Sequence, residues 1–368
     1  MGLVAGTQCG RETSSELHMR TKATEDRPER FSQRNVGFNR QHSDEKHPAR
    51  NKKTRSPNDE TGRPRPYHAP EDFALQAGAW AVARRAQGMG EIWEPKEGVE
   101  PDCSEPEHLT ARVKEAARLY GATMVGVARV DPRWIYESTG DAEPIELPEG
   151  VDTTVVIGVP MDYELMRSAP SAVAAASTGN GYSRMAFATT CTAQFFTELG
   201  FRAMPCGNDT GLSIPLAVDA GLGECGRNGL LITRELGPRV RLCKVFTDAP
   251  LVADTPAELG VRSFCGDCLK CCDECPANAI TRGEQTTEGP TPSNHPGIKR
   301  WFVDPDKCLS FWRVSCSSCI RSCPFNKPEG RIHEWARALV ERRSPAINRF
   351  LLRLDDALGY GKRLGGKY

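Results

Sequence analysis

Apolar residues in this chain recur at regular spacing only after the first 70 or so residues. Residues 1–68 are rich in Arg, Lys, Glu, Asp, Ser, Asn and Pro and hold few large apolar side chains. Such a segment buries too little apolar surface to offset its ordering entropy, so we predict a disordered polar tail. Residues 71–90 favour a helix that ends at a glycine, within a helical extension over residues 69–104.

The middle of the chain alternates between helical and strand-like patterns. Leu109, Val113, Ala116 and Leu119 recur at helical spacing. Apolar or alternating runs of five to nine residues are typical of strands. The predicted elements are helices over residues 107–119 and 183–199, and strands over residues 122–130, 153–159 and 239–246. Strands interleaved with helices predict an α/β or α+β domain over residues 105–260.

Length and net charge limit the number of domains and the kinds of partner that the chain can have. The 368 residues allow one large and one small domain, and a net charge of zero gives no argument for a nucleic acid or an anionic membrane as partner. A final segment, residues 331–368, favours one or two helices interrupted near Pro345. No apolar run reaches the roughly 18–20 residues that span a bilayer.

The N-terminus shows no signal peptide with an apolar core, and no hydrophobic stretch follows the twin arginines at Arg84 and Arg85. We therefore expect a cytoplasmic protein. A lost or misassigned twin-arginine leader would instead make it exported and membrane-associated.

Eight of the fifteen cysteines lie in the last third of the chain at regular spacings, in a module predicted over residues 261–330. They form the runs Cys265-x-x-Cys268-x-x-Cys271-x-x-x-Cys275-Pro276 and Cys308 followed by Cys316-x-x-Cys319-x-x-x-Cys323-Pro324. The first run has the bacterial ferredoxin spacing, in which the fourth cysteine binds the other [4Fe–4S] cluster.

The ferredoxin spacing predicts two crossed sets of cluster ligands. Cluster one takes Cys265, Cys268, Cys271 and Cys323, whereas cluster two takes Cys275, Cys308, Cys316 and Cys319. The alternative is a pair of zinc knuckles, but zinc uses two pairs of cysteines rather than these longer runs. Cys272, beside a ligand, is expected to be a bystander, and the aromatic residues near the second run are expected to pack in the core.

Residues 205–232 are unusually rich in glycine. Glycines let the backbone approach a large flat ligand, or they form tight turns in a loop-rich connection. Neither the dinucleotide fingerprint G-x-G-x-x-G nor the P-loop pattern occurs here, so a nucleotide loop is not supported.

Several motifs together resemble the corrinoid-dependent reductive dehalogenase family, which is related to epoxyqueuosine reductase. They are the two cysteine runs, residues 121–136 (GATMVGVARVDPRWIY), 181–185 (GYSRM), 207–215 (GNDTGLSIP), 237–246 (GPRVRLCKVF) and 356–363 (DALGYGKR). The resemblance covers residues 105–368. It implies an α+β protein, with a nitroreductase-like α/β domain that holds cobalamin followed by a ferredoxin-like domain with two [4Fe–4S] clusters.

The resemblance also implies roles for individual residues. Tyr182 would donate a proton, Arg241 would be its neighbouring cation and Asn208 would help to place the substrate or the tyrosine. A cation near a phenol, which ordinarily titrates near pH 10, favours the phenolate and makes the phenol a stronger acid. The corrinoid contacts expected in the glycine-rich segment are Gly207, Thr210, Gly211, Ser213, Gly221 and Gly223.

The histidines bear on how a corrinoid would bind. None of the seven has an Asp two positions before it, which excludes the Asp-x-His-x-x-Gly loop that supplies the lower cobalt ligand in many cobalamin proteins. The resemblance likewise implies a base-off corrinoid without a protein ligand. The sequence leaves open whether cobalt attacks the halogen or the carbon.

The implied reaction replaces the halogen of an organohalide by hydrogen, with electrons from an external ferredoxin or flavodoxin. The chain departs from respiratory members in lacking a twin-arginine leader, and from another branch in lacking a fused flavin and ferredoxin reductase unit. Two other functions stay open. One is an epoxyqueuosine reductase that acts on tRNA, and the other is an iron–sulfur electron carrier without a corrinoid.

Overall fold

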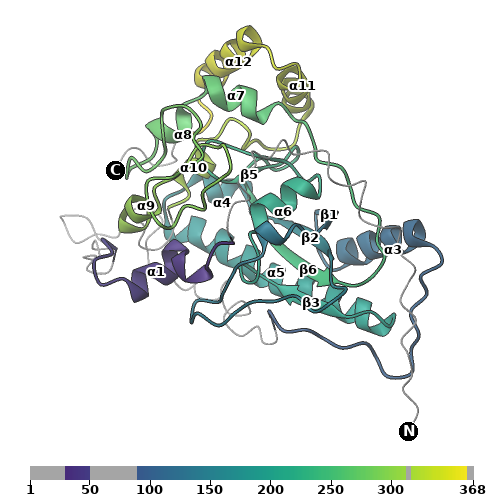
Figure 1. Ribbon diagram of the computed structural model, residues 1–368. Coiled ribbons are helices and arrows are strands. Elements are labelled where there is room, and N and C mark those ends of the chain that lie inside the picture. The colour runs from purple at the N-terminus through teal and green to yellow at the C-terminus, as the bar shows by residue number, and fades with distance from the viewer. Residues whose placement is uncertain (1–29, 50–88, 312–315, 363–368) are drawn as a thin grey trace.

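The computed structural model describes residues 30–49, 89–311 and 316–362. Its centre is a four-stranded antiparallel sheet in the order β1-β2-β6-β3 (Figure 1). The strands are β1 (Met124–Arg129), β2 (Thr153–Pro160), β6 (Val240–Thr247) and β3 (Ala203–Cys206). The three strands expected from the sequence are confirmed, and the antiparallel pairing makes the domain α+β.

Helices cover both faces of this sheet. The long helix α5 (Ala172–Glu198) and α3 (Pro106–Leu119) lie on one face, and α6 (Ser213–Asp219) lies on the other. Side chains of β2 alternate between the two, with Val155 and Ile157 in the α5 core and Val156 in the α6 core. The strands therefore consist of nearly continuous apolar runs, because neither face meets water.

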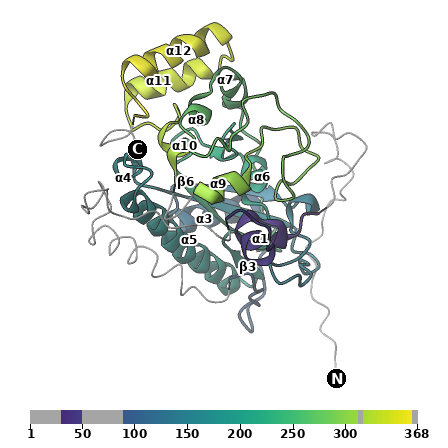
Figure 2. The ribbon, with the colours of Figure 1, turned by 90° about the vertical axis from the view of Figure 1, so that its left-hand side faces the viewer.

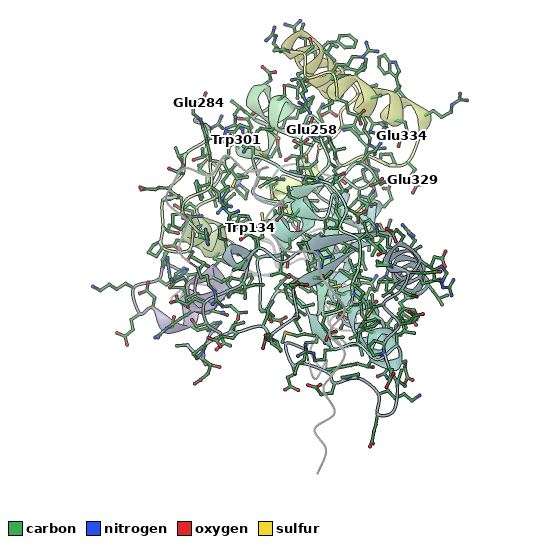
Figure 3. All side chains as sticks on the ribbon, turned by 45° about the vertical axis from the view of Figure 1, so that its right-hand side comes forward. Trp134, Glu258, Glu284, Trp301, Glu329 and Glu334 are labelled. Atoms are coloured by element: carbon green, nitrogen blue, oxygen red, sulfur yellow. The ribbon has the colours of Figure 1, made fainter. Side chains whose placement is uncertain are left out.

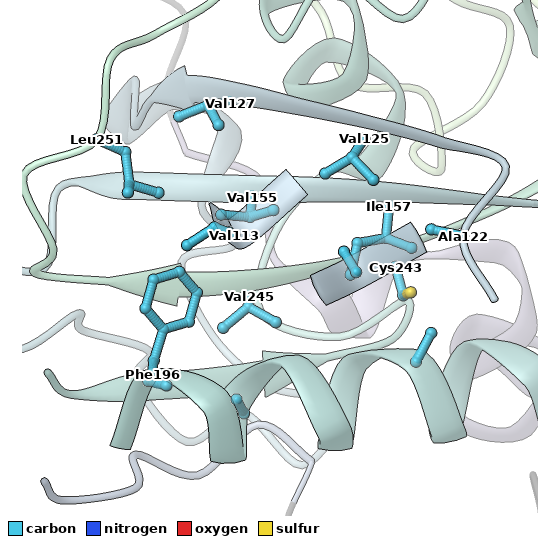
Figure 4. Packing of buried hydrophobic residues seen from close by; sticks show 14 of the residues in the cluster. Val113, Ala122, Val125, Val127, Val155, Ile157, Phe196, Cys243, Val245 and Leu251 are labelled. Carbon is cyan, nitrogen blue, oxygen red and sulfur yellow. The ribbon is translucent and has the colours of Figure 1, made fainter. Parts of the chain in front are cut away.

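Figure 4 shows the core on the α5 side, where strand residues such as Val155 and Val245 face Phe196 of the helix. Helix α5 begins well before the predicted start at residue 183. Ser171 caps it by accepting a hydrogen bond from the Ala174 amide, and alanines 172 and 174–176 follow. The small polar and glycine residues at positions 177–181 concealed this first half, since their propensity is poor and only burial keeps them helical.

Short elements connect the main ones. They are η3 (Pro132–Trp134), α4 (Tyr163–Arg167) and the two-stranded sheet of β4 (Glu224–Cys225) and β5 (Leu231–Ile232).

The cysteine module follows the sheet domain and is built from short helices and loops. These are α7 (Val261–Asp267), α8 (Lys270–Asp273), α9 (Pro305–Phe311) and α10 (Ser318–Arg321). The chain ends in an antiparallel pair, α11 (Arg331–Val340) and α12 (Pro345–Ala357), which confirms two helices interrupted near Pro345. Figure 1 shows this pair with α7 at the end of the molecule farthest from the sheet.

Part of the expected polar tail is ordered. Residues 30–49 form η1 (Gln33–Asn35) and α1 (Gly37–Ser43), and α1 lies beside α9 (Figure 2). Arg40 and His47 both contact the carboxylate of Asp306. The prediction of disorder is wrong here because it counted apolar burial, whereas this segment is held by buried polar contacts. The rest of residues 1–68 and the helix predicted from residue 71 lie outside the described residues, apart from a turn at 89–90. The helical extension predicted to continue to residue 104 is wrong over its last part, since residues 91–104 are described and contain no helix.

No helix in the described ranges combines the length and the apolar composition that a bilayer span requires.

Candidate active site

Three residues predicted to work together meet around one phenol oxygen. The Asn208 side-chain amide donates to Tyr182 Oη at 2.8 Å, and Arg241 Nη1 donates to the same oxygen at 3.4 Å. The Arg241 guanidinium carbon also lies 5.3 Å from the centre of the Tyr182 ring, in cation–π range. The phenol is therefore held by one neutral and one cationic donor, which stabilise negative charge on its oxygen.

The sheet explains how Arg241 reaches Tyr182. Alternate residues of a strand point to opposite faces, and Arg241 shares its parity with Cys243 and Val245, which lie in the core beneath α5. Tyr182 extends from α5 and packs against the same core. Strand and helix thus present the two side chains to each other.

Asn208 lies in the loop that follows β3, the strand next to β6. Cys206, the last residue of β3, pairs with Lys244 of β6 in an antiparallel register. The loop that follows β3 carries Asn208 to the same phenol oxygen that Arg241 contacts. Residue 208 thus lies near Arg241 although the two are far apart in the sequence.

Gly181 makes room for Arg241. A Cβ on this residue would lie 2.7 Å from Arg241 Cγ and 3.6 Å from Met161 Cγ, where the first distance is too short for any real contact. Since Gly181 directly precedes Tyr182 in α5, a side chain there would push the guanidinium away from the phenol. The glycine that weakens the helix is therefore a requirement of the site.

The loop that carries Asn208 is fixed by Asp209. Its carboxylate accepts hydrogen bonds from the Gly207 amide at 2.7 Å and from Thr210 Oγ1 at 3.0 Å. Thr210 is buried and has a left-handed backbone, with φ +63°. A non-glycine residue in this conformation costs energy, and such strain persists where the surroundings enforce it, often at functional sites.

Lys244 supports the same loop and was not predicted. Its side chain is completely buried, and Nζ donates to the Gly207 carbonyl at 2.7 Å and lies 3.2 Å from Ser213 Oγ. Burial lowers the pKa of this lysine. The sequence held a signal, because Lys244 occupies the strand parity of Leu242 and Phe246, where an apolar residue would be expected.

The predicted corrinoid contacts fall into two groups. Gly207 and Ser213 both contact the Lys244 ammonium, and Thr210 and Gly211 lie in the loop between them. Gly221 and Gly223 instead face the protein's own backbone, since a Cβ would lie 2.5 Å from the Thr255 carbonyl oxygen and 2.3 Å from that of Ile232. Internal packing accounts for these two glycines, and their contact with a corrinoid stays a prediction.

The described histidines are placed away from Tyr182. His47 bonds to Asp306, His295 to the Pro296 carbonyl and His333 to Tyr360 Oη. His42 lies on α1 and His108 on α3, neither of which contributes to the phenol site. The groups shown to contact the phenol oxygen are an amide and a guanidinium, and the binding of a corrinoid without an imidazole ligand stays a prediction.

The first cysteine set surrounds one cavity. Cys265, Cys268, Cys271 and Cys323 line it, together with the apolar residues Phe264 and Phe325. Burial raises the pKa of the Cys268 thiol to about 11 and that of Cys323 to about 12. Thiolates at such a buried position need a strong local positive charge, which iron ions supply. The four residues predicted for cluster one are thus brought together.

The second set is also gathered at one place. Burial raises the pKa of Cys319, and so do the neighbouring thiols of Cys316, Cys308 and Cys275. Cys275 likewise raises the pKa of Cys316, after the larger effect of burial. Cys323 of the first set raises the pKa of Cys319 as well, so these effects show that the thiols lie close together, and the crossing of Cys275 toward the second run stays a prediction.

The second set is connected to the phenol site by direct packing. Cys319 and Leu230 pack against a small apolar cluster that contains Met161. The sulfur of Met161 accepts a hydrogen bond from Arg241 Nε at 3.3 Å. An apolar cluster that contains Met161 therefore links Cys319 of the second set to the arginine that holds Tyr182.

Buried arginines attach the cysteine module to the sheet domain. Arg227 donates to the Cys265 carbonyl at 2.9 Å and lies over the ring of Trp301, 4.4 Å from its centre. Figure 3 marks Trp301 within the module. Trp301 and Phe302 are buried, which confirms that these two aromatic residues pack in the core, whereas Trp312 lies outside the described residues.

Comparison with known proteins finds matches for both the sheet domain and the cysteine module. Residues 129–251 match the family model "Reductive dehalogenase subunit", and residues 264–326 match "4Fe-4S double cluster binding domain". A tetrachloroethene reductive dehalogenase of Sulfurospirillum multivorans is 39% identical over 296 residues, which cover 72% of this chain and 59% of the relative.

A solved structure of a catabolic reductive dehalogenase in complex with 3-bromo-4-hydroxybenzoic acid superposes with a TM-score of 0.75 at 26% identity. The match covers 93% of this chain and 48% of that protein, so this chain spans about half to three-fifths of the length of these relatives.

An epoxyqueuosine reductase of Cyclobacterium marinum is 32% identical over 114 residues, 30% of this chain and 36% of that protein. That similarity is confined to a minor part of the chain. The dehalogenase similarity extends over most of it and includes both the sheet domain and the cysteine module. The chain belongs to the reductive dehalogenase family.

Proposed function

We propose that this chain replaces a halogen of an organohalide by hydrogen at a corrinoid fed by two [4Fe–4S] clusters. The balanced reaction is R–X + 2e⁻ + H⁺ → R–H + X⁻. The observation that carries the proposal is the phenol of Tyr182, held by Asn208 and Arg241 and connected through Met161 to the second cysteine set. It combines a proton donor with a route for electrons.

Tyr182 would supply the proton in this reaction. Asn208 and Arg241 both donate to its oxygen, so they stabilise the phenolate that remains after the proton has left. Lys244 and Asp209 hold the loop from both sides and thereby fix the position of Asn208. A corrinoid bound beside this loop would supply the two-electron chemistry at the carbon–halogen bond.

The eight cysteines would hold the clusters in the crossed sets predicted from the sequence. Cys319 packs against the apolar cluster that contains Met161, whereas Cys265, Cys268 and Cys271 line a cavity together with Phe264. We infer that electrons enter at cluster one and leave from cluster two toward Tyr182.

The test is halide release. The full chain is reconstituted anaerobically with iron, sulfide and cobalamin, and bromide or chloride is measured with a panel of halogenated phenols and alkenes and a reduced viologen. We expect halide release that requires both cofactors. A fully loaded protein that releases no halide from any member of the panel would contradict the proposal.

A further inference from the structure

The C-terminal helix pair exposes an unusual amount of apolar surface. Half of the eight large apolar side chains that are exposed among the described residues lie on α11 and α12 or at the end of α12. They are Ile332, Trp335, Phe350 and Leu358, with 58%, 52%, 54% and 56% of their surface exposed. Exposed apolar residues that are concentrated in this way mark interaction sites.

Three of these residues line one groove. Ile332 and Trp335, which are one helical turn apart on α11, face Leu358 at the end of α12 across it. Lys327, with its ammonium 3.8 Å from the centre of the Tyr360 ring, lines the groove as well. The pair of helices therefore forms a shaped surface rather than a flat face.

The groove is separated from the cluster-one cavity by a single layer of side chains. Phe264, Pro324 and Phe325 line both spaces, and the two phenylalanine rings meet edge to face with centres 5.2 Å apart. Cys323 directly precedes this wall in the chain. Because electron tunnelling slows steeply with distance, a donor seated in the groove would be well placed to reduce cluster one.

The C-terminal segment that forms the groove carries an excess of basic side chains although the whole chain is neutral. Residues 331–362 carry seven basic and four acidic side chains. The basic ones are Arg331, Arg337, Arg342, Arg343, Arg349, Arg353 and Lys362, and the acidic ones are Glu334, Glu341, Asp355 and Asp356. Figure 3 marks Glu334 on this helix pair. A partner with an excess of acidic residues would be attracted and oriented here.

We propose that the groove between α11 and α12 docks an acidic one-electron carrier protein, which inserts an apolar side chain between Ile332, Trp335 and Leu358. One electron passes from the carrier to cluster one, and no bond forms or breaks. The inference rests on the proposed function in one respect, namely that the cysteine module carries electrons inward to the phenol site.

The test measures cluster reduction rather than halide release. The full chain with both clusters is mixed in a stopped-flow instrument with flavodoxin hydroquinone, whose flavin changes colour when it loses an electron. Trp335→Glu places a charge in the groove and should lower the second-order rate about tenfold, as loss of an interface hot spot does. Reduction by methyl viologen, a small donor that needs no docking, should be unchanged.

Two further variants complete the experiment. Arg331→Glu combined with Arg353→Glu should slow the flavodoxin reaction at low ionic strength, and added salt should reduce the difference. Leu119→Glu is the matched control, because Leu119 is 82% exposed at the end of α3, away from the cysteine module. This variant should leave the rates of cluster reduction by flavodoxin and by methyl viologen unchanged.

Several outcomes would overturn the proposal. An unchanged flavodoxin rate in Trp335→Glu would exclude docking at the groove, and an equal loss with both donors would mean that the substitution damages the module. A wild-type dimer that becomes monomeric only in Trp335→Glu would assign the groove to a second copy of the chain. Failed halide release with normal flavodoxin rates would refute the proposed function and leave the docking site standing.

Discussion

The cysteine module and the phenol site use opposite ways of bringing functional groups together. Seven of the eight cysteines come from two runs of at most eleven residues, and short helices and loops suffice to gather them. Tyr182, Asn208 and Arg241 come from a helix, a loop and a strand spread over sixty residues, and the sheet brings them together. Cluster ligands are identical thiolates, so local spacing can specify them. A proton donor needs different groups in fixed orientation, which a rigid sheet supplies.

The sheet domain that holds the phenol site and the cysteine module are joined by close packing and buried hydrogen bonds. A Cβ on Gly237, which has φ +56°, would lie 2.3 Å from the Phe325 carbonyl oxygen in the cysteine module. The next arginine, Arg239, is buried and donates to Asn326 Oδ1 at 3.0 Å and to the Met161 carbonyl at 2.7 Å. Changes in either region can therefore be tested separately only when these contacts are left intact.

The largest effect is expected from Cys319→Ala. Loss of one thiolate should remove cluster two, about half of the bound iron, and all turnover. Cys272→Ala is the matched control, since Cys272 is a buried cysteine of the same module that points its sulfur at the Thr281 carbonyl, 3.5 Å away. Iron analysis and electron paramagnetic resonance measure the cluster content of both variants. If Cys272→Ala lost the same amount of iron, the ligand sets would be wrong.

Tyr182→Phe tests the other region alone. The ring and its packing under Arg241 remain, but the proton is gone, so iron and corrinoid content should stay constant while halide release falls by about 10²–10⁴-fold. Tyr120→Phe, at the end of α3, should retain full activity. Turnover in Tyr182→Phe equal to that of the wild type would remove this residue from its proposed role.

Gly181→Ala should separate activity from stability. The added methyl would displace Arg241, and a small misplacement of a catalytic group can cost up to about a hundredfold in rate. Alanine also favours a helix over glycine by up to about 1 kcal/mol, so thermal unfolding should not occur at a lower temperature. Gly266→Ala in α7, where a Cβ would contact nothing within 4 Å, should leave turnover intact. Lower stability together with unchanged turnover would contradict this account of Gly181.

Lys244→Met should give the smallest effect. The Gly207 carbonyl loses its donor, which loosens the loop of Asn208, and we expect roughly a fivefold loss of turnover, since a single hydrogen bond contributes about 1 kcal/mol. The unfolding free energy should change little, because removal of a buried charge offsets the lost contact. Lys114→Met, which breaks a half-exposed ion pair with Asp254, is the control for activity. A large loss of stability in Lys244→Met would assign the lysine to the fold alone.

Much of the sheet domain could be predicted from apolar periodicity, but the supports of the site could not. The β2 and β6 runs are apolar enough to identify, because both faces of the sheet are covered. The first half of α5 was missed because its small residues lack helical propensity and are held by burial. Residues 30–49 were misjudged because Asp306, which Arg40 and His47 contact, lies more than 250 residues away in the chain.

By itself the sequence determined the strands and the family and predicted the two crossed cysteine sets, since these depend on local spacing and on motifs. Only the tertiary structure decided that the apolar cluster of Met161 links Cys319 to Arg241. It likewise decided that the absence of a side chain at Gly181 leaves room for the guanidinium and that Lys244 holds the Asn208 loop. It also decided that the α11–α12 groove lies next to cluster one. The physical reason is that packing and buried hydrogen bonds join residues without regard to their separation in the chain.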